Sequence, residues 1–176
     1  MIRSFNGKTP RIAASSFISE AAYIIGDVEI GENSTVWPGA VIRGDTGRVV
    51  IGNNTAIEDG CILHSGMPPD VDMFIGDNVN IGHGAMVHCK RIHNHVLVGI
   101  NAVVLHHAEI GDYCLIGAGC VVSERMVVPD HSFVVGVPGK IKGKVTEKQI
   151  FWLDDAPREY AELGRRYKGE GLEGKR

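Results

Sequence analysis

The sequence predicts an all-β solenoid: a parallel β-helix built from six-residue repeats, with a C-terminal α-helix packed on it. Three observations carry this prediction. Aliphatic residues recur every six positions, glycine supplies 23 of the 176 residues, and phenylalanine, tyrosine and tryptophan together supply only 6%. Glycine is therefore about twice as frequent as in an average protein. Many tight turns around small, repeated core layers account for this composition.

The aliphatic positions form four runs with six-residue steps: Ile18 to Ile42, Ile51 to Leu63, Ile75 to Val87, and Val98 to Val134. A period of six is neither the 3.6 of a helix nor the 2 of a simple strand. A short strand and a tight corner give one such unit, and three units close a coil of 18 residues. One unit cannot bury its apolar side chains alone, whereas stacked coils can. A β-sandwich is the alternative, and the unbroken last run weighs against it.

The six-residue spacing is interrupted twice: three extra residues lie between Ile42 and Ile51, and six extra residues lie between Leu63 and Ile75. Each such interruption is called a slip. Both slips are predicted to be loops that leave the corners of the coil. The second contains Met67-Pro68-Pro69-Asp70, which are residue types of turns. Loops on a rigid scaffold often carry binding residues.

The repeat defines a β-helix domain over residues 1–140, and residues 141–176 form a helical segment and tail of the same domain. Thr146 is a predicted N-cap. Pro157 predicts a break or kink, or a second helix capped by Asp154 or Asp155. The apolar residues at helical spacing are Ile150, Phe151, Leu153, Tyr160, Leu163 and Tyr167.

Charge and composition exclude several function classes. Lys plus Arg is 18 and Asp plus Glu is 21, so the net charge is 18 − 21 = −3. This argues against nucleic acid or an anionic membrane as partner, although it does not exclude a local basic patch. No apolar run approaches the ~20 residues of a membrane span, and the N-terminus lacks a signal peptide. The sequence therefore predicts a cytoplasmic protein.

Three of the eight histidines stand out by their place in the repeat. His64 follows Leu63 and His88 follows Val87, so the two take the same position. The 24 residues between them are one coil of 18 plus the slip of six, so their rings are predicted to stack on adjacent coils. Two such imidazoles can hold one zinc ion at ~2.0–2.1 Å each. His83 belongs to the preceding unit and is predicted to face away from the pair.

A homotrimer would bring the three histidines together. His83 of one subunit can meet His64 and His88 of its neighbour across a heterologous interface, which gives three equivalent sites. Zinc bound by three histidines lowers the pKa of its water towards ~7, and the hydroxide can attack a small electrophile such as carbon dioxide, an ester or a thioester. The alternative is that all three are ordinary surface residues.

The remaining histidines and the cysteines are interpreted as structural. The histidines read as surface or hydrogen-bonded residues are His93, His95, His106, His107 and His131. Cys61, Cys114 and Cys120 take an inward position of the repeat, so they belong to the predicted core. Cys89 is adjacent to His88, but neighbouring residues on a strand face opposite ways and rarely share a metal.

The sequence resembles the gamma-class carbonic anhydrases, which are hexapeptide-repeat proteins. The resemblance spans roughly residues 8–167 and is carried by residues 37–45 (WPGAVIRGD), His64, residues 81–88 and residues 134–140. It implies a left-handed β-helix, a homotrimer, and zinc (or iron or cobalt) held by the three histidines across the interface. The implied activity is hydration of carbon dioxide to bicarbonate.

The resemblance also assigns roles to four further residues. Arg43 and Asp45 form an ion pair at the subunit interface near the metal; as an isolated surface pair it would contribute little. Glu58 replaces a glutamine of better-known members and can orient the metal-bound water or act as a base. Tyr160 corresponds to a tyrosine that lines the site.

The chain departs from the prototype enzyme in one respect, because it lacks the acidic loop that carries protons. Asp70 and Asp72 are the candidate replacements, and weak carbon dioxide hydration is expected. Two other functions stay open: a metal-binding relative that acts on thioesters or lacks catalysis, and a coenzyme A-dependent acyltransferase with a metal-free histidine base. Metal content separates the acyltransferase from the other two functions.

Overall fold

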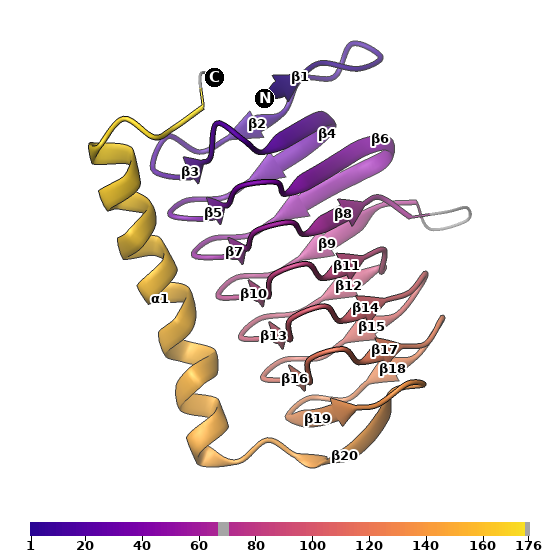
Figure 1. The fold of residues 1–176 in the computed structure, drawn as a ribbon. Coiled ribbons are helices and arrows are strands. Elements are labelled where there is room, and N and C mark those ends of the chain that lie inside the picture. The colour runs from indigo at the N-terminus through magenta and orange to yellow at the C-terminus, as the bar shows by residue number, and fades with distance from the viewer. Residues whose placement is uncertain (67–70, 175–176) are drawn as a thin grey trace.

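The computed structural model describes residues 1–66 and 71–174 and shows a stack of β-coils with one long helix along its side (Figure 1). Most strands are two residues long and pair in parallel with their equivalents on neighbouring coils. The predicted parallel solenoid with a C-terminal helix is therefore confirmed. The predicted excursion at residues 67–70 lies outside the described residues.

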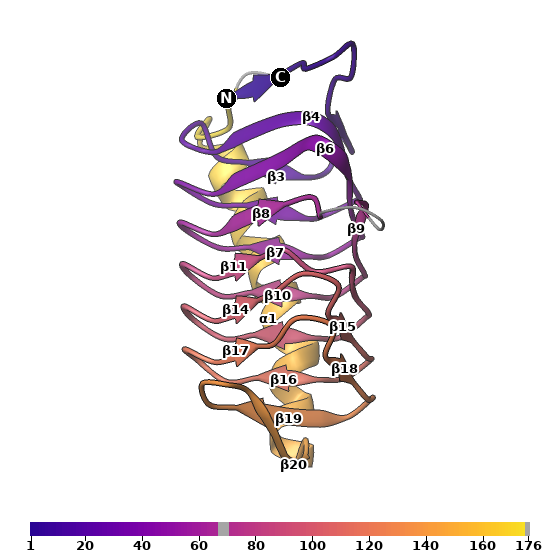
Figure 2. The ribbon, with the colours of Figure 1, turned by 90° about the vertical axis from the view of Figure 1, so that its right-hand side faces the viewer.

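The coil has three faces, which Figure 2 shows from a second side. The first face consists of β3 (Phe17–Ile18), β5 (Thr35–Val36), β7 (Ala56–Ile57), β10 (Asn80–Ile81), β13 (Leu97–Val98), β16 (Leu115–Ile116), β19 (Ser132–Val135) and the antiparallel β20 (Lys140–Lys144). The second consists of β8 (Ile62–His64), β11 (Met86–Val87), β14 (Val103–Val104) and β17 (Val121–Val122). The third consists of β9 (Met73–Ile75), β12 (Arg91–Ile92), β15 (Glu109–Ile110) and β18 (Val127–Val128).

The register reproduces the predicted coil of 18 residues. Leu97 pairs with Leu115, and Arg91 pairs with Glu109, and the residues of each pair are 18 positions apart in the sequence. Asn80 pairs with Ala56, 24 residues earlier, because the six-residue slip lies between them. Each slip therefore lengthens one coil without disturbing the stacking of the next.

The slip of three residues is not the predicted corner loop. β4 (Tyr23–Ile30) and β6 (Val41–Ile51) are long strands that pair with each other through the corner. Their pairing register shifts between Gly26 and Val28. A Cβ on Gly26 would lie 2.3 Å from the carbonyl oxygen of Gly44, so glycine permits this close approach. β1 (Ile2–Arg3) and β2 (Arg11–Ile12) pair with β4 at the N-terminal end.

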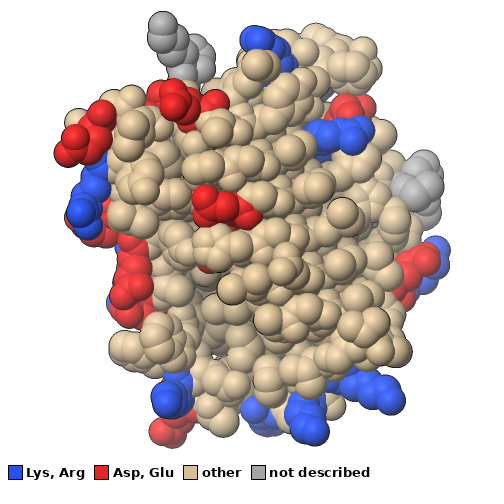
Figure 3. Space-filling model, in the orientation of Figure 1, with Lys and Arg blue, Asp and Glu red and all other residues tan. Residues whose placement is uncertain are grey.

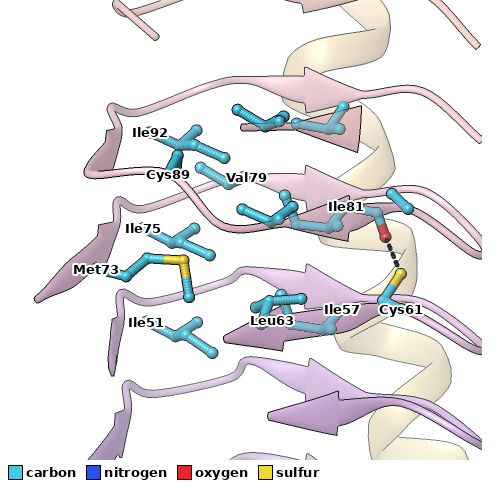
Figure 4. Packing of buried hydrophobic residues seen from close by; sticks show 14 of the residues in the cluster. Ile51, Ile57, Cys61, Leu63, Met73, Ile75, Val79, Ile81, Cys89 and Ile92 are labelled. Carbon is cyan, nitrogen blue, oxygen red and sulfur yellow. Dashed lines mark hydrogen bonds between the residues drawn. The ribbon is translucent and has the colours of Figure 1, made fainter. Parts of the chain in front are cut away.

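The core is a column of aliphatic side chains inside the coils. Figure 4 shows Ile51, Leu63, Ile75 and Ile81 pointing inward from β6, β8, β9 and β10. The four cysteines are free and buried, and for Cys61, Cys114 and Cys120 this confirms the prediction from the repeat. The thiol of Cys61 donates to the carbonyl oxygen of Ile81 at 3.4 Å (Figure 4). These layers make the solenoid a rigid support for residues at its corners.

The C-terminal helix, α1 (Glu147–Gly169), packs on β3, β5, β7 and β10. Thr146 is its N-cap, as predicted, and forms a capping box with Gln149. The predicted break at Pro157 is wrong: the helix is continuous, and Pro157 is buried in it. Packing on the sheet outweighs the one backbone hydrogen bond that proline removes. Within residues 1–66 and 71–174, no helix is both long and apolar enough to span a membrane.

Candidate metal centre

His64 and His88 stack on neighbouring coils, as the repeat predicts. His64 ends β8 and His88 directly follows β11, and these strands pair with Leu63 opposite Val87. The ring centroids are 4.9 Å apart and the ring planes differ by 28°. Both rings lie at the edge of a cavity of about 300 Å³ on the second face.

One nitrogen of each ring points to the other ring. His88 Nε2 lies 3.1 Å from His64 Nδ1, while His64 Nε2 lies 3.0 Å from Asp45 Oδ1. Arg43 donates to Asp45 Oδ2 from Nε at 3.0 Å and from Nη2 at 2.8 Å. The structure thus places the Arg43–Asp45 pair behind His64, where it fixes the orientation of the imidazole.

The local electrostatics favour an ionised Asp45 and a neutral His88. Burial raises the pKa of Asp45, but hydrogen bonds from Arg43 and His64 outweigh burial and leave it lowered. Burial and the neighbouring His106 and His64 lower the pKa of His88 to about 4. His88 therefore keeps a free lone pair at neutral pH.

His106 is a neighbour of this pair that the sequence analysis missed. Its ring centroid lies 4.0 Å from that of His88, with the two planes nearly perpendicular. His106 lies two residues after Val104, which pairs with Val87. The 18-residue register could have placed His106 beside His88. However, His106 takes a different position in the six-residue repeat from His64 and His88.

His83 lies in a second cluster around the buried carboxylate of Glu58. Glu58 Oε1 accepts from Asn80 Nδ2 at 2.7 Å, and Glu58 Oε2 accepts from the backbone N–H of His83 at 2.9 Å. His83 Nε2 lies 3.0 Å from Glu58 Oε2, and its Nδ1 lies 2.9 Å from Asp59 Oδ2. Asn80 and Asp59 are members of the cluster that the sequence analysis did not single out.

Tyr160 reaches the same cluster from α1. Its ring packs edge-on against Trp37 at 5.5 Å, and its hydroxyl is hydrogen-bonded to Glu58. Burial, followed by the negative charge of Glu58, raises the pKa of Tyr160 well above its usual range. Tyr160 is therefore a neutral hydrogen-bond donor, and the helix positions it beside Glu58 as the predicted site requires.

The two clusters are separate within one chain. A turn at residues 83–84 places His83 at a corner of the coil, whereas His88 follows β11 on the second face. Accordingly, no three His, Cys, Asp or Glu side chains converge on a metal position within the described parts of the chain. Cys89 is buried in the core, which raises the pKa of its thiol to about 12.

An apolar groove adjoins the second cluster. It has a volume of about 560 Å³ and extends from Glu58, His83 and Tyr160 along the first face of the solenoid. Its apolar walls come from outward-facing residues of β13, β16 and β19, together with Ile100. The groove is large enough for a small organic ligand.

Comparison with known proteins agrees with the β-solenoid fold. The bacterial transferase hexapeptide family (six repeats) matches residues 9–44 and 90–124. A hexapeptide transferase family protein from Anaplasma phagocytophilum has a similar structure, with a TM-score of 0.88 and 32% identity, over 95% of this chain and 98% of that one. The fold is therefore that of the left-handed β-helix proteins with hexapeptide repeats.

Two relatives with similar sequences indicate which family of hexapeptide-repeat proteins the chain belongs to. A carbonic anhydrase of Geobacillus kaustophilus is 40% identical over 168 residues, which cover 96% of this chain and 91% of the relative. Gamma carbonic anhydrase 2 of Arabidopsis thaliana, a mitochondrial protein, is 30% identical over 93% of this chain and 60% of its own length. The chain belongs to the gamma-class carbonic anhydrase family.

Proposed function

We propose that the protein is a zinc-dependent carbonic anhydrase that hydrates carbon dioxide to bicarbonate, with iron or cobalt as possible substitutes for zinc. The observation that carries this proposal is the 3.1 Å approach of His88 Nε2 to His64 Nδ1. Two nitrogens bound to one tetrahedral zinc ion lie about 3.3 Å apart. The pair therefore fits a shared metal ion with little movement of either ring.

The surroundings of the pair also suit a metal. Asp45 engages His64 Nε2, which leaves Nδ1 as the ligand atom, and such carboxylate contacts orient metal-binding histidines in many proteins. A bound zinc ion would supply a Lewis acid that lowers the pKa of water towards ~7. His83 of a neighbouring subunit would complete the set of three ligands.

A homotrimer is part of this proposal. Ile62 and Met86, on the second face beside the histidine pair, are 39% and 46% exposed, and Ile100, near the corner that carries His83, is 50% exposed. Contact between that corner and the second face of a neighbour would bury these side chains. The same contact would bring the two histidine clusters together.

Glu58 and Tyr160 are the proposed catalytic residues. If His83 turns towards the metal, Glu58 Oε2 loses one donor and gains room to accept a proton from water. Asn80 and the His83 backbone N–H hold the carboxylate in place meanwhile. Tyr160 can donate to an oxygen of the substrate or keep its bond to Glu58.

A second candidate, chemistry on thioesters by hydrolysis or by coenzyme A-dependent acyl transfer, is favoured by the apolar groove beside His83. Carbon dioxide needs no groove of about 560 Å³, whereas an acyl chain would. The similar structure from Anaplasma phagocytophilum, a transferase family protein, also supports this candidate.

Metal content and turnover separate these functions. Protein purified without a chelator or a metal-affinity tag should contain about one zinc or iron per chain and should hydrate carbon dioxide. His88→Ala should lose both properties. Metal without carbon dioxide hydration, but with thioester hydrolysis, would favour a metal enzyme that acts on thioesters. Absence of metal after reconstitution would contradict the metal enzyme altogether and leave the coenzyme A-dependent acyltransferase.

A further inference from the structure

The C-terminal end of the solenoid carries a surface that the proposed function does not use. β20 closes the stack at this end, and α1 begins directly after it (Figure 1). We call this the end surface and define it by its exposed lysines and large apolar side chains: Lys140, Ile141, Lys142, Lys144, Lys148, Phe151 and Trp152.

The end surface is strongly basic although the chain is acidic. Residues 139–152 contain four lysines and one acid, Glu147, for a net charge of 4 − 1 = +3, against −3 for the whole chain. Within residues 1–66 and 71–174, none of these four lysines forms an ion pair. Figure 3 shows blue side chains along the lower edge of the molecule, where β20 lies. The positive charge is therefore available to a partner.

Large apolar side chains share this surface. Phe151 is 61% exposed, Trp152 is 53% exposed and Ile141 is 47% exposed. Phe151 is one of the apolar residues at helical spacing, yet most of its side chain is exposed. Because Cα–Cβ bonds in a helix tilt towards its N-terminus, both aromatic side chains lean towards the end of α1 that follows β20. Trp37 is buried, so Trp152 is the exposed member of the two tryptophans.

Protection of the sheet edge against pairing with another chain would explain the lysines of the end surface, but not its apolar side chains. Lysines on an edge strand such as β20 prevent pairing with another chain. They do not explain three exposed apolar side chains, including two aromatic rings, beside them. A second copy docked end to end would place two end surfaces of like charge, +3 each, against one another. Nucleic acid would leave the side chain of Ile141 without an apolar partner. An anionic lipid bilayer satisfies both the charge and the apolar side chains.

We propose that the end surface docks on an anionic lipid bilayer. The lysines contact the headgroups, and Phe151 and Trp152 enter the interfacial layer, where aromatic side chains are most favourable. Each lysine near such a surface strengthens binding about fivefold. The docking is peripheral and holds the solenoid with its coils stacked away from the membrane.

The test uses the full-length protein with vesicles of phosphatidylcholine, with and without phosphatidylserine. We expect cosedimentation only with the phosphatidylserine vesicles, weakened at high salt. The tryptophan fluorescence should shift to the blue, and Trp152→Phe should abolish that shift. Equal binding to both kinds of vesicle, or to neither, would overturn the proposal.

Two sets of variants locate the contact. The triple variant Lys140→Glu, Lys142→Glu and Lys144→Glu should weaken binding on the order of a hundredfold or more. Its control is the triple variant Arg3→Glu, Arg158→Glu and Arg166→Glu, which makes the same change in net charge at exposed residues outside the end surface. The double variant Phe151→Ser and Trp152→Ser should also weaken binding, unlike its control, Val127→Ser with Leu172→Ser.

Thermal unfolding of each variant verifies that it is folded, and the aromatic double variant keeps the test decisive if the lysine variant fails to fold. Three results would overturn the proposal. They are equal losses in variant and control, tight binding to duplex DNA without binding to vesicles, and dissociation of the oligomer by the lysine variant. The last would assign the end surface to a contact between subunits.

Discussion

Asp45 Oδ1 lies 3.0 Å from His64 Nε2, and this contact leaves His64 Nδ1 turned towards His88 Nε2 at 3.1 Å. A carboxylate on β6 thereby determines which nitrogen of His64 faces the proposed metal position. The orientation of the pair depends on a residue that binds no metal itself. This relationship leads to the first prediction.

Asp45→Ala should lower the zinc affinity of the protein by about 10- to 100-fold, because removal of such a carboxylate frees the histidine ring to rotate. Zinc affinity is measured by competition with a chelating dye. Asp155→Ala on α1 is the control and should leave the affinity unchanged. Equal affinities in all three proteins would show that Asp45 does not position His64.

The stability of the metal-free protein should depend on the protonation of His88. Its pKa is about 4 in the folded chain, against an ordinary value of 6.5. Between these values the unfolded chain binds the extra proton, so the free energy of unfolding falls as the pH falls from 6.5 to about 4. Above pH 6.5 this group contributes no pH dependence.

Urea unfolding at several pH values measures this effect. His88→Gln should show a flatter decline between pH 6.5 and about 4, whereas His93→Gln should behave as the unaltered protein. Parallel curves for all three proteins would mean that His88 titrates normally in the folded chain.

Glu58→Gln should lower turnover by about 100-fold and leave the metal content unchanged. The carboxylate accepts hydrogen bonds at both oxygens, from Asn80 and from the backbone of His83, so an amide would direct an NH₂ group at one of these donors. Glu162→Gln on α1 is the control, because its exposed carboxylate pairs with Arg165 outside the cluster. Full turnover in Glu58→Gln would exclude Glu58 as the base.

Met86→Arg should dissociate the proposed trimer and release the metal. Met86 is 46% exposed on β11, and a buried unpaired charge at this contact would be strongly unfavourable. Val127→Arg, at an exposed residue of β18 on the third face, should leave the oligomer intact. Sedimentation velocity gives the mass, and an unchanged mass for Met86→Arg would remove the second face from the interface.

Gly26→Ala should destabilise the fold by about 1–3 kcal/mol or more. Gly26 has φ +85°, and an added Cβ would lie 2.3 Å from the carbonyl oxygen of Gly44. Gly143→Ala is the control, since nothing lies within 4 Å of its Cβ position. Chemical denaturation measures both variants, and equal stabilities would show that β4 and β6 can separate at this corner.

The sequence by itself determined the features that repeat. The six-residue period predicted the solenoid, the inward cysteines and the stacking of His64 on His88, because each coil places equivalent residues at equivalent points. Local chemistry likewise predicted Thr146 as the N-cap. These features follow from spacing along the chain, which the sequence contains in full.

Only the tertiary structure decided the features that depend on contacts through space. The helix continues through Pro157 because its packing on the first face outweighs the lost hydrogen bond. Asn80 holds Glu58, although this contact does not repeat along the coils. The direction of Phe151 also depends on where α1 meets the end of the sheet. Such contacts join residues from different coils and from the helix, so their partners are fixed only when the chain is folded.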